Sequence, residues 1–310
     1  MFGLVASCII FALDVSRVGV IRQQFTLNER PSMVVRSENQ SRVIARHGNG
    51  VRTLRLGGFI FFGSAYGLQE RVKRLIEAEK PHTIVFDFSG CTGVDSSAAA
   101  SLSRLRVYMR QSGVRAVFAG MRPSTAQTLR SGGGNDAPEF FPDLDRALEE
   151  CETRLIDEHL PHAHAARNLP EWLADALGGH EWAGKLAARL KPAPLVDGDC
   201  LCRQGDPTDS LLFIERGRVS VFVDGPHHEP LRVRVFAPHT IAGEIGFFLN
   251  APRTATMRAA PDAVVWLLDR ETFVDLRESD PGLAAALLAY IVRLQAERLA
   301  FATRQITALQ

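Results

Sequence analysis

Two short segments in the C-terminal half of the chain carry opposite charges that could together bind an anionic sugar. Ala242-Gly243-Glu244-Ile245-Gly246 is followed a few residues later by Pro252-Arg253-Thr254-Ala255-Thr256. A short helix starting near Glu244 would direct free backbone N–H groups at an anion, and Arg253 offers a planar fork that matches two phosphate oxygens. The Glu244 carboxylate has only acceptors, so it could take a ribose hydroxyl. The segments therefore predict a sugar-phosphate site, with a simple Glu244–Arg253 pair as the alternative.

A second segment that could do chemistry is Gly93-Val94-Asp95-Ser96-Ser97-Ala98, which follows the apolar run Val85-Phe86-Asp87-Phe88. Asp and Ser just before a helical pattern are typical of an N-cap, where a side-chain oxygen accepts a hydrogen bond from a free backbone N–H. A phosphate on Ser97 would also gain from the positive end of the helix dipole. Capping is the plainer interpretation, and Ser97 is kept as a candidate phosphorylation site.

The cysteines and histidines form no recognisable catalytic or metal-binding pattern. The five cysteines are scattered in a chain too long to depend on disulfides, which favours a reducing compartment. Cys200 and Cys202 lack the second pair or the spaced histidines of a zinc site. Four histidines lie in one stretch: His159, His162, His164 and His180. No carboxylate completes a ligand set there. We predict no metal, no cofactor and no catalytic residue, because no kinase loop or nucleophile elbow is present either.

Composition and charge describe an ordinary globular chain. Its 310 residues exceed the usual size of one domain, so two domains with separate cores are expected. Hydrophobic residues make up 46% and charged residues 23%, which is enough to build both cores. Lys and Arg number 36 against 35 Asp and Glu, so the net charge of +1 lacks the basic excess that nucleic-acid binding uses. We therefore expect no nucleic-acid partner.

The first residues form an apolar run that is too short to span a bilayer. Residues 2–13 are apolar or small and end at Asp14 and Arg17, whereas a spanning helix needs about 20 apolar residues. Only Met1 precedes the run, which argues against a signal peptide. We interpret residues 1–14 as a buried helix or the remnant of a membrane helix, and residues 15–50 as a polar connector.

The pattern between residues 51 and 165 alternates between strands and helices. Apolar runs at 51–56 and 59–62 are separated by Gly57 and Gly58, which predicts a pair of strands. Further strands are expected at 83–88 and 114–119, and helices at 66–79, 96–111 and 144–164. This alternation predicts an α/β layer fold.

Beyond residue 170 the pattern changes to short strands separated by glycines. Strands are expected at 211–214, 219–223, 231–236 and 264–268, with turns at Gly198, Gly205, Gly217 and Gly225. This pattern predicts an antiparallel roll. Asp280-Pro281 then begins a helix whose apolar stripe is Leu283, Leu287, Ile291 and Leu294, so a long closing helix should follow the roll.

The roll carries motifs that resemble the cyclic nucleotide-binding domain family. They are Gly205-Asp206, Phe213-Ile214-x-x-Gly217-x-Val219, Gly243-Glu244 and Pro252-Arg253-Thr254-Ala255. The resemblance implies a cAMP or cGMP ligand, with Arg253 on the cyclic phosphate and Glu244 on the ribose. It also implies that Gly243 and the Ile245 amide complete the cradle, that the helix after Pro281 acts as a lid, and that Thr254 favours guanine over adenine.

The first half is similar to the STAS domain. The similarity rests on the strand that leads into Asp95-Ser96-Ser97, and in the anti-sigma-factor antagonists the residue matching Ser97 is phosphorylated. Asp14-Val15-Ser16-Arg17 and Leu54-Arg55-Leu56-x-Gly58-Phe59-Ile60-Phe61-Phe62-Gly63 also occur in the order seen at the cytoplasmic end of SulP-type anion transporters. This resemblance implies that residues 2–13 end a transmembrane helix and that the partner is a SulP-like membrane core.

We therefore predict an α+β multidomain chain. An α/β STAS domain at 51–165 should precede a cyclic nucleotide-binding domain at 170–310, an antiparallel, jelly-roll-like β-roll with flanking helices. The expected function is that of a regulatory sensor and not of an enzyme. We expect it in the cytoplasm, at the inner face of the plasma membrane, as part of a SulP-like sulfate or anion transporter. Two alternatives stay open: a soluble STAS signalling protein switched by phosphorylation of Ser97, and a ligand-blind interaction module. A homo-oligomer also stays open.

Overall fold

The computed structural model describes residues 19–131, 139–160, 168–195, 198–225 and 229–307, which form two compact units. One unit comprises Met1–Ser32 and Val43–His159, and the other comprises Met33–Arg42 and Leu160–Gln310. The chain therefore leaves the first unit, enters the second, and returns to the first before it completes the second. The apolar run at 2–13 lies outside the described residues. Among the helices that are described, none is long and apolar enough to cross a membrane.

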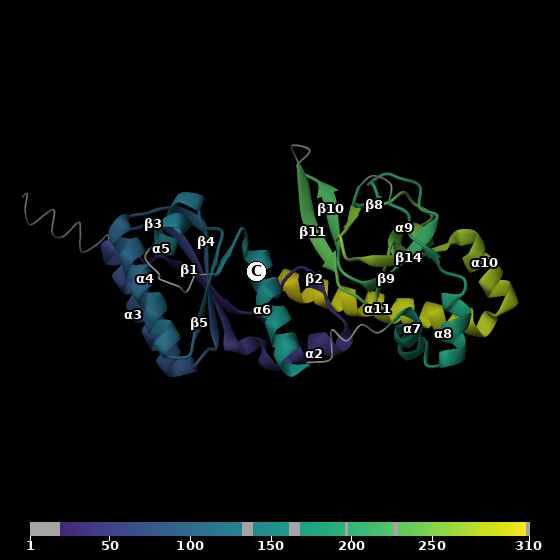
Figure 1. Ribbon diagram of the computed structural model, residues 1–310, viewed down its shortest axis with the longest axis horizontal. Coiled ribbons are helices and arrows are strands. Elements are labelled where there is room, and N and C mark those ends of the chain that lie inside the picture. The colour runs from purple at the N-terminus through teal and green to yellow at the C-terminus, as the bar shows by residue number, and fades with distance from the viewer. Residues whose placement is uncertain (1–18, 132–138, 161–167, 196–197, 226–228, 308–310) are drawn as a thin grey trace, which may run out of the picture. The chain divides into compact units, whose positions relative to one another are not determined.

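The first unit is a five-stranded sheet with helices on both faces (Figure 1). The strand order is β1-β3-β4-β5-β6, in which β1 runs antiparallel to β3 and the other neighbours are parallel. The strands are β1 (Ile21–Thr26), β3 (Val51–Ile60), β4 (Thr83–Val94), β5 (Arg115–Ala119) and β6 (Glu139–Phe141). The helices of this unit are α3 (Phe62–Glu79), α4 (Ser96–Gln111), α5 (Pro123–Ser131) and α6 (Leu144–His159). Parallel strands joined by helices confirm the predicted α/β layer.

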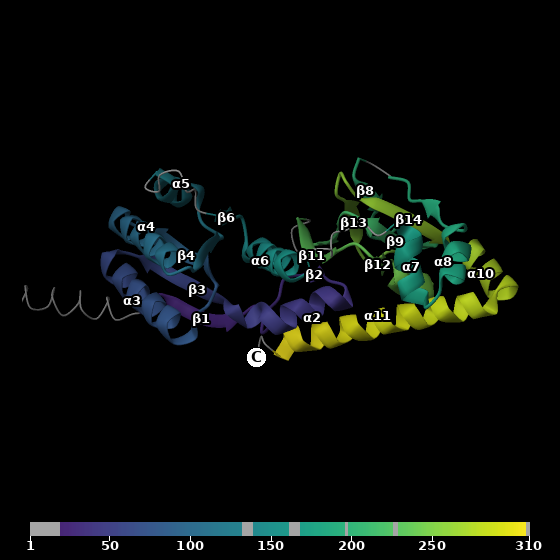
Figure 2. The ribbon, with the colours of Figure 1, turned by 60° about the horizontal axis from the view of Figure 1, so that its bottom comes forward.

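Helices α3 and α4 lie side by side on one face of this sheet, and α6 lies on the other (Figure 2). The apolar face of α3 includes Leu68 and Val72, and that of α4 includes Leu102 and Leu105; all four are buried in one core with Phe86 of β4. The spacing of three or four residues puts these side chains on one helical face, which is why the two segments fold as helices against the sheet. The predicted helix at 96–111 is confirmed.

Residues 51–60 form one strand, so the predicted pair of strands is wrong. The ladder between β3 and β4 shifts its register next to Gly57 and again next to Gly58. Gly58 has a φ of +83°, a conformation that favours glycine. The two glycines therefore mark an irregularity inside a long strand and not a turn between two strands. The predicted connector at 15–50 also holds regular elements, because β1 lies within it and pairs with β3.

The second unit contains two sheets and several helices. The strand orders are β2-β11-β10-β13-β8 and β12-β9-β14-β7. The strands are β2 (Val34–Val35), β7 (Lys191–Pro192), β8 (Cys200–Cys202), β9 (Ser210–Arg216), β10 (Val219–Asp224), β11 (Pro230–Phe236), β12 (Thr240–Ala242), β13 (Thr256–Ala259) and β14 (Val264–Asp269). The helices are α7 (Leu169–Leu177), α8 (His180–Ala187), α9 (Glu244–Leu249), α10 (Arg270–Ser279) and α11 (Pro281–Thr307). All pairs except β2–β11 are antiparallel, which confirms the predicted antiparallel roll.

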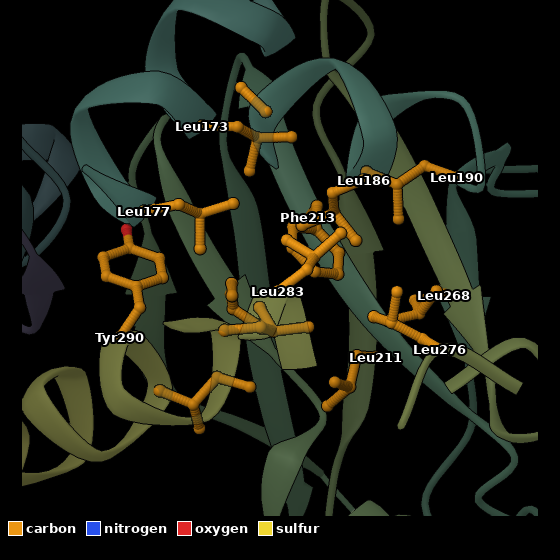
Figure 3. Close-up of a cluster of buried hydrophobic side chains, with 14 of the residues drawn as sticks. Leu173, Leu177, Leu186, Leu190, Leu211, Phe213, Leu268, Leu276, Leu283 and Tyr290 are labelled. Carbon is orange, nitrogen blue, oxygen red and sulfur yellow. The ribbon is translucent and has the colours of Figure 1, made fainter. Parts of the chain in front are cut away.

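Strand β9 is buried on both faces and separates two cores. Leu212 and Ile214 belong to the core between the two sheets. Leu211 and Phe213 belong to the core that the sheet shares with the helices (Figure 3). Successive side chains of a strand point to opposite faces, so a strand between two cores reads as a continuous apolar run. This is the physical reason for the unbroken apolar sequence at 211–214.

The long closing helix α11 is anchored in the core of the second unit. Leu283 and Tyr290 pack in the cluster that Figure 3 shows, together with helices α7, α8 and α10. The Trp172 indole donates to the Tyr290 hydroxyl at 3.2 Å. At its start, the Leu283 amide donates to the Asp280 carboxylate at 3.2 Å, which confirms that the helix begins at Pro281 as predicted.

A short strand from the expected connector completes one sheet of the second unit. β2 pairs in parallel with β11, and amides of Val235 and Ala237 donate to carbonyls of Met33 and Val35 at 3.2 and 3.3 Å. Val34 is buried in a small cluster with Val235 and Ala237. The segment Met33–Arg42 is therefore part of the roll.

Candidate functional site

The candidate site lies where β12 passes into the short helix α9. Gly243 has a φ of +84°, and the helix begins at Glu244, as the sequence predicts. A Cβ on Gly243 would lie 2.3 Å from Nη1 of Arg253, so the guanidinium packs directly on the glycine backbone. Any larger residue would displace the arginine. The two predicted segments are thus brought into contact.

A neighbouring loop fixes the backbone of Arg253, and the start of β9 holds its side chain. The Gly205 amide donates to the Arg253 carbonyl, and the Arg253 amide donates to the Asp206 carbonyl, both at 2.8 Å. The guanidinium Nη2 donates to Oγ of Ser210 at 3.0 Å, and Ser210 in turn donates to the Asp209 carboxylate at 3.0 Å. Gly205-Asp206 therefore positions the arginine.

Several polar atoms in the site are buried and have no hydrogen-bond partner among the described residues. They are Nε and Nη1 of Arg253, Oε2 of Glu244 and Oγ1 of Thr208. Arg253 and Glu244 are each only 6% exposed. A buried polar group without a partner costs about 1–3 kcal/mol, and more when it is charged. The arrangement therefore suits a ligand that brings anionic oxygens to the arginine and a hydroxyl to the carboxylate.

Sequence reasoning missed Arg298, the residue that pairs with Glu244. Nη1 of Arg298 donates to Oε1 of Glu244 at 2.7 Å, and the arginine is itself 6% exposed. Glu244 is therefore paired with the closing helix and not with Arg253. A signal was available, because Arg298 continues the stripe that runs through Ile291 and Leu294 at helical spacing. A charged residue in an apolar stripe needs a buried partner.

Positive charge gathers around the Glu244 carboxylate. The guanidinium of Arg234 on β11 is partly buried near Arg298 and Glu244. Burial, followed by the charge of Arg298, lowers the pKa of Arg234, and Glu244 opposes this effect. The guanidinium groups of Arg234 and Arg298 thus lie near Glu244, and that of Arg253 packs on the neighbouring Gly243. This gathering of positive charge favours an anionic ligand.

The other two predicted site residues lie at the surface. Ile245, the second residue of α9, has a side chain that is 47% exposed, so only its backbone amide remains as a candidate ligand contact. Thr254 follows Arg253 directly and is exposed. The structure therefore brings Gly243 together with the buried Glu244 and Arg253 and leaves Ile245 and Thr254 at the surface.

In the first unit, Asp95 forms the predicted cap of a helix. Its carboxylate accepts a hydrogen bond from the Ala98 amide at 2.6 Å, and its own amide donates to the Ile60 carbonyl at 3.0 Å. Ser96 and Ser97 are exposed in the first turn of α4. The Ser97 hydroxyl is therefore accessible at the N-terminal end of the helix.

The cysteines and histidines take other roles. Cys200 and Cys202 are buried free thiols on β8. The His159 ring stacks on that of His47 with 3.7 Å between centroids, while His162 and His164 lie outside the described residues. Within the described ranges, no group of three or more histidine, cysteine or acidic side chains is arranged to hold a metal ion.

Two protein-family models match separate parts of the chain. Residues 42–147 match the STAS domain, and residues 194–280 match the cyclic nucleotide-binding domain. The first match covers strands β3 to β6 with helices α3, α4 and α5 and only the start of α6. The second match includes Gly243, Glu244 and Arg253.

Curated relatives are similar to this chain over only part of their own length. Acetyltransferase Pat of Mycolicibacterium smegmatis is 39% identical over 118 residues, which are 37% of this chain and 33% of that protein. Glutaminase 1 of Bradyrhizobium diazoefficiens is 24% identical over 304 residues, which are 96% of this chain and 48% of that protein. The vacuolar basic amino acid transporter VSB1 of Saccharomyces cerevisiae is 23% identical over 168 residues, which are 51% of this chain and 16% of that protein. The chain thus spans about half or less of these relatives.

The two matches agree with the two units of the structure. One unit is a mainly parallel sheet with helices on both faces, and the other is an antiparallel roll with a buried arginine and glutamate beside a glycine in a left-handed conformation. The chain therefore carries a STAS domain followed by a cyclic nucleotide-binding domain.

Proposed function

We propose that this chain is a regulatory sensor whose second unit binds cAMP or cGMP and whose first unit passes the signal to a partner. The observation that carries the proposal is the buried guanidinium of Arg253, with Nε and Nη1 unpaired among the described residues. A cyclic phosphate keeps one negative charge at neutral pH and offers two oxygens to such a fork. The match of residues 194–280 to the cyclic nucleotide-binding domain supports this ligand class.

Each site residue has a distinct role in this proposal. Arg253 donates hydrogen bonds to the cyclic phosphate. Glu244 accepts a hydrogen bond from the ribose 2′-hydroxyl at Oε2, the oxygen that does not accept from Arg298. Gly243 leaves the room in which the guanidinium and the phosphate meet, and the Ile245 amide donates to the ligand. The exposed hydroxyl of Thr254 contacts the base and favours guanine.

We propose that the partner that receives the signal is a SulP-like anion transporter. The chain would then be its cytoplasmic regulatory part, at the inner face of the plasma membrane. Support comes from the STAS match at 42–147 and from the partial likeness to a protein named as a vacuolar transporter. The likeness of 96% of the chain to part of a protein named glutaminase favours a second output, an enzyme under the control of the same two domains. In both versions this chain is regulatory and is not itself the enzyme.

A second candidate function concerns Ser97. Its exposed hydroxyl at the start of α4 would receive a phosphate at the positive end of the helix. In this version the chain is a soluble STAS signalling protein that a kinase switches. Mass spectrometry of protein from its native cell tests this function, and phosphate found only at other residues would exclude it.

Calorimetric titration of the full chain with cAMP and with cGMP tests the sensor. Arg253→Ala should weaken binding by about thirtyfold or more, because removing one member of a buried charge pair costs about 2–5 kcal/mol. Glu244→Ala should cost less, roughly 1.5–3 kcal/mol, since it removes one hydrogen bond from a neutral hydroxyl to a charged acceptor.

Arg258→Ala is the matched control, because Arg258 lies on β13, is exposed and pairs with Asp199 at 3.0 Å. Its affinity should equal that of the wild type. If wild-type protein gives neither heat nor a thermal shift with either nucleotide, the sensor is excluded and the ligand-blind interaction module takes its place.

A further inference from the structure

Arg298 reaches the site from the closing helix and is held by contacts with three other elements. Nη1 donates to Glu244 of α9 at 2.7 Å, and Nη2 donates to Oγ1 of Thr240 at 2.9 Å and to the carbonyl of Ile241, both on β12. The guanidinium also lies over the ring of Phe236 on β11, 4.8 Å from its centroid. These contacts fix the orientation of the guanidinium as well as its charge.

Arg298 fixes the direction in which the Glu244 carboxylate points. A carboxylate that is 6% exposed needs a partner that offsets the cost of its burial. Arg298 binds only Oε1, so Oε2 stays buried and without a hydrogen-bond partner among the described residues. The pair therefore holds one oxygen in place and presents the other.

We infer that Arg298 is a positioning residue of the ribose subsite, which holds one oxygen of Glu244 and aims the other at the ligand's 2′-hydroxyl. This inference rests on the proposed nucleotide-binding function. It makes the closing helix a part of sugar recognition, because α11 must stay in place for Glu244 to accept the hydroxyl. Arg298 touches no ligand in this assignment, in contrast to Arg253.

The test compares two ligands that differ in one hydroxyl, cAMP and 2′-deoxy-cAMP, against the full-length chain. Arg298→Ala should weaken cAMP binding by about tenfold or more, the scale of one hydrogen bond to a charged acceptor, and should leave 2′-deoxy-cAMP binding nearly unchanged. Glu244→Ala should show the same selectivity. The double variant should bind cAMP no more weakly than Glu244→Ala alone, because both changes remove the same interaction.

Two further variants separate positioning from general damage to the helix. Arg298→Lys keeps the cation and should recover part of the preference for cAMP over 2′-deoxy-cAMP. This variant also tests the inference if Arg298→Ala does not fold. Arg293→Ala is the matched control on the same helix, since Arg293 is exposed and lies 5.4 Å from the Tyr290 ring centroid. Its preference between the two ligands should equal that of the wild type.

Three results would overturn the inference. Equal losses for both ligands in Arg298→Ala would assign Arg298 to the structure of the helix. Tighter cAMP binding by this variant would show that Arg298 blocks the site. Unchanged cAMP binding by this variant would show that Glu244 binds the ribose without being positioned by Arg298. If the wild type binds neither ligand, the proposed function itself fails, and that result is distinct from the other three.

Discussion

At the scale of single residues, aspartates at strand-to-helix junctions fix where helices begin. Asp95 caps α4 by accepting from the Ala98 amide at 2.6 Å, and Asp269 caps α10 by accepting from the Thr272 amide at 2.7 Å. Both residues have the extended backbone that an N-cap requires. Each carboxylate satisfies a backbone donor that the helix itself leaves unpaired, so the junction is stabilised locally and independently of the nucleotide site.

Asp95→Ala should therefore lower the free energy of unfolding of the first unit by about 1 kcal/mol, the usual value of a lost N-cap. Ser97→Ala, two residues along, changes an exposed side chain and should stay within about 0.5 kcal/mol of the wild type. Urea unfolding, monitored by hydrogen exchange in α4, measures the change in free energy for both variants. If Asp95→Ala lowered the free energy of unfolding no more than Ser97→Ala does, the cap would contribute nothing.

The chemistry of single residues could be predicted where the relevant atoms lie close together in the sequence. Glu244 and Arg253 belong to neighbouring segments, and their residue types alone indicated an anionic sugar. Arg298 is 54 residues from Glu244, and only the packing of α11 brings the two together. No spacing rule reports such a contact, and sequence reasoning therefore missed Arg298.

At the scale of elements, the junction between β14 and α10 joins a cap to an ion pair. The carboxylate of Asp269 accepts from Nζ of Lys191 on β7 at 2.6 Å as well as from the backbone of α10. The hydrogen bonds from Lys191 and then from Thr272 lower the pKa of Asp269 to about 2. One ionised side chain thus stabilises a strand edge and a helix start together.

This shift predicts a pH dependence of the stability of the second unit. The folded pKa lies below the value of about 3.9 expected for an unfolded aspartate, so the contribution is complete above that value and is lost as the pH falls toward 2. Asp269→Ala should cost about 1–2 kcal/mol at pH 7, an estimate discounted for partial exposure. The difference from the wild type should shrink between about pH 4 and pH 2.

Urea unfolding across that range is the measurement. Asp262→Ala provides the control, because Asp262 lies at an exposed turn of the same unit. Its small effect should not vary with pH in this way. If the difference in free energy of unfolding between the wild type and Asp269→Ala did not change with pH, the charged form of Asp269 would not be what stabilises the unit.

Long, strongly periodic elements could be predicted from the sequence, whereas short or irregular ones could not. The helix α4 and the start of α11 were found because their apolar residues repeat at helical spacing. The irregular middle of β3 was mistaken for a turn, since two adjacent glycines such as Gly57 and Gly58 are typical both of a turn and of an irregularity within a strand. β2 has only two residues, Val34 and Val35, too few for any period to appear.

At the scale of the whole molecule, the path of the chain matters more than the order of its domains. The polypeptide enters the second unit at Met33–Arg42, returns to the first unit at Val43, and re-enters the second at Leu160. A strand added in this way covers the edge of β11, which would otherwise present unpaired backbone groups. The second unit is therefore completed by residues that precede most of the first unit, and a fragment that begins after residue 168 lacks one of its strands.

Val34→Asp tests whether this strand is a structural part of the roll. Val34 is 3% exposed against Val235 and Ala237, so the substitution would bury an unpaired charge and should cost roughly 2–4 kcal/mol. Hydrogen exchange should become faster in β11 and β10, the strands next to β2 in the sheet order. Exchange in β4 and β5 of the first unit should stay at the wild-type rate.

Met33→Asp is the matched control for this substitution, because its side chain is 41% exposed at the adjacent position. It introduces the same charge in the same segment, yet water can solvate the carboxylate, so exchange in β11 should stay close to that of the wild type. If Val34→Asp instead left β11 protected and made β4 and β5 exchange faster, residues 33–42 would belong energetically to the first unit. Since the amides of Val235 and Ala237 donate into this segment, we expect the roll to be the unit that loosens.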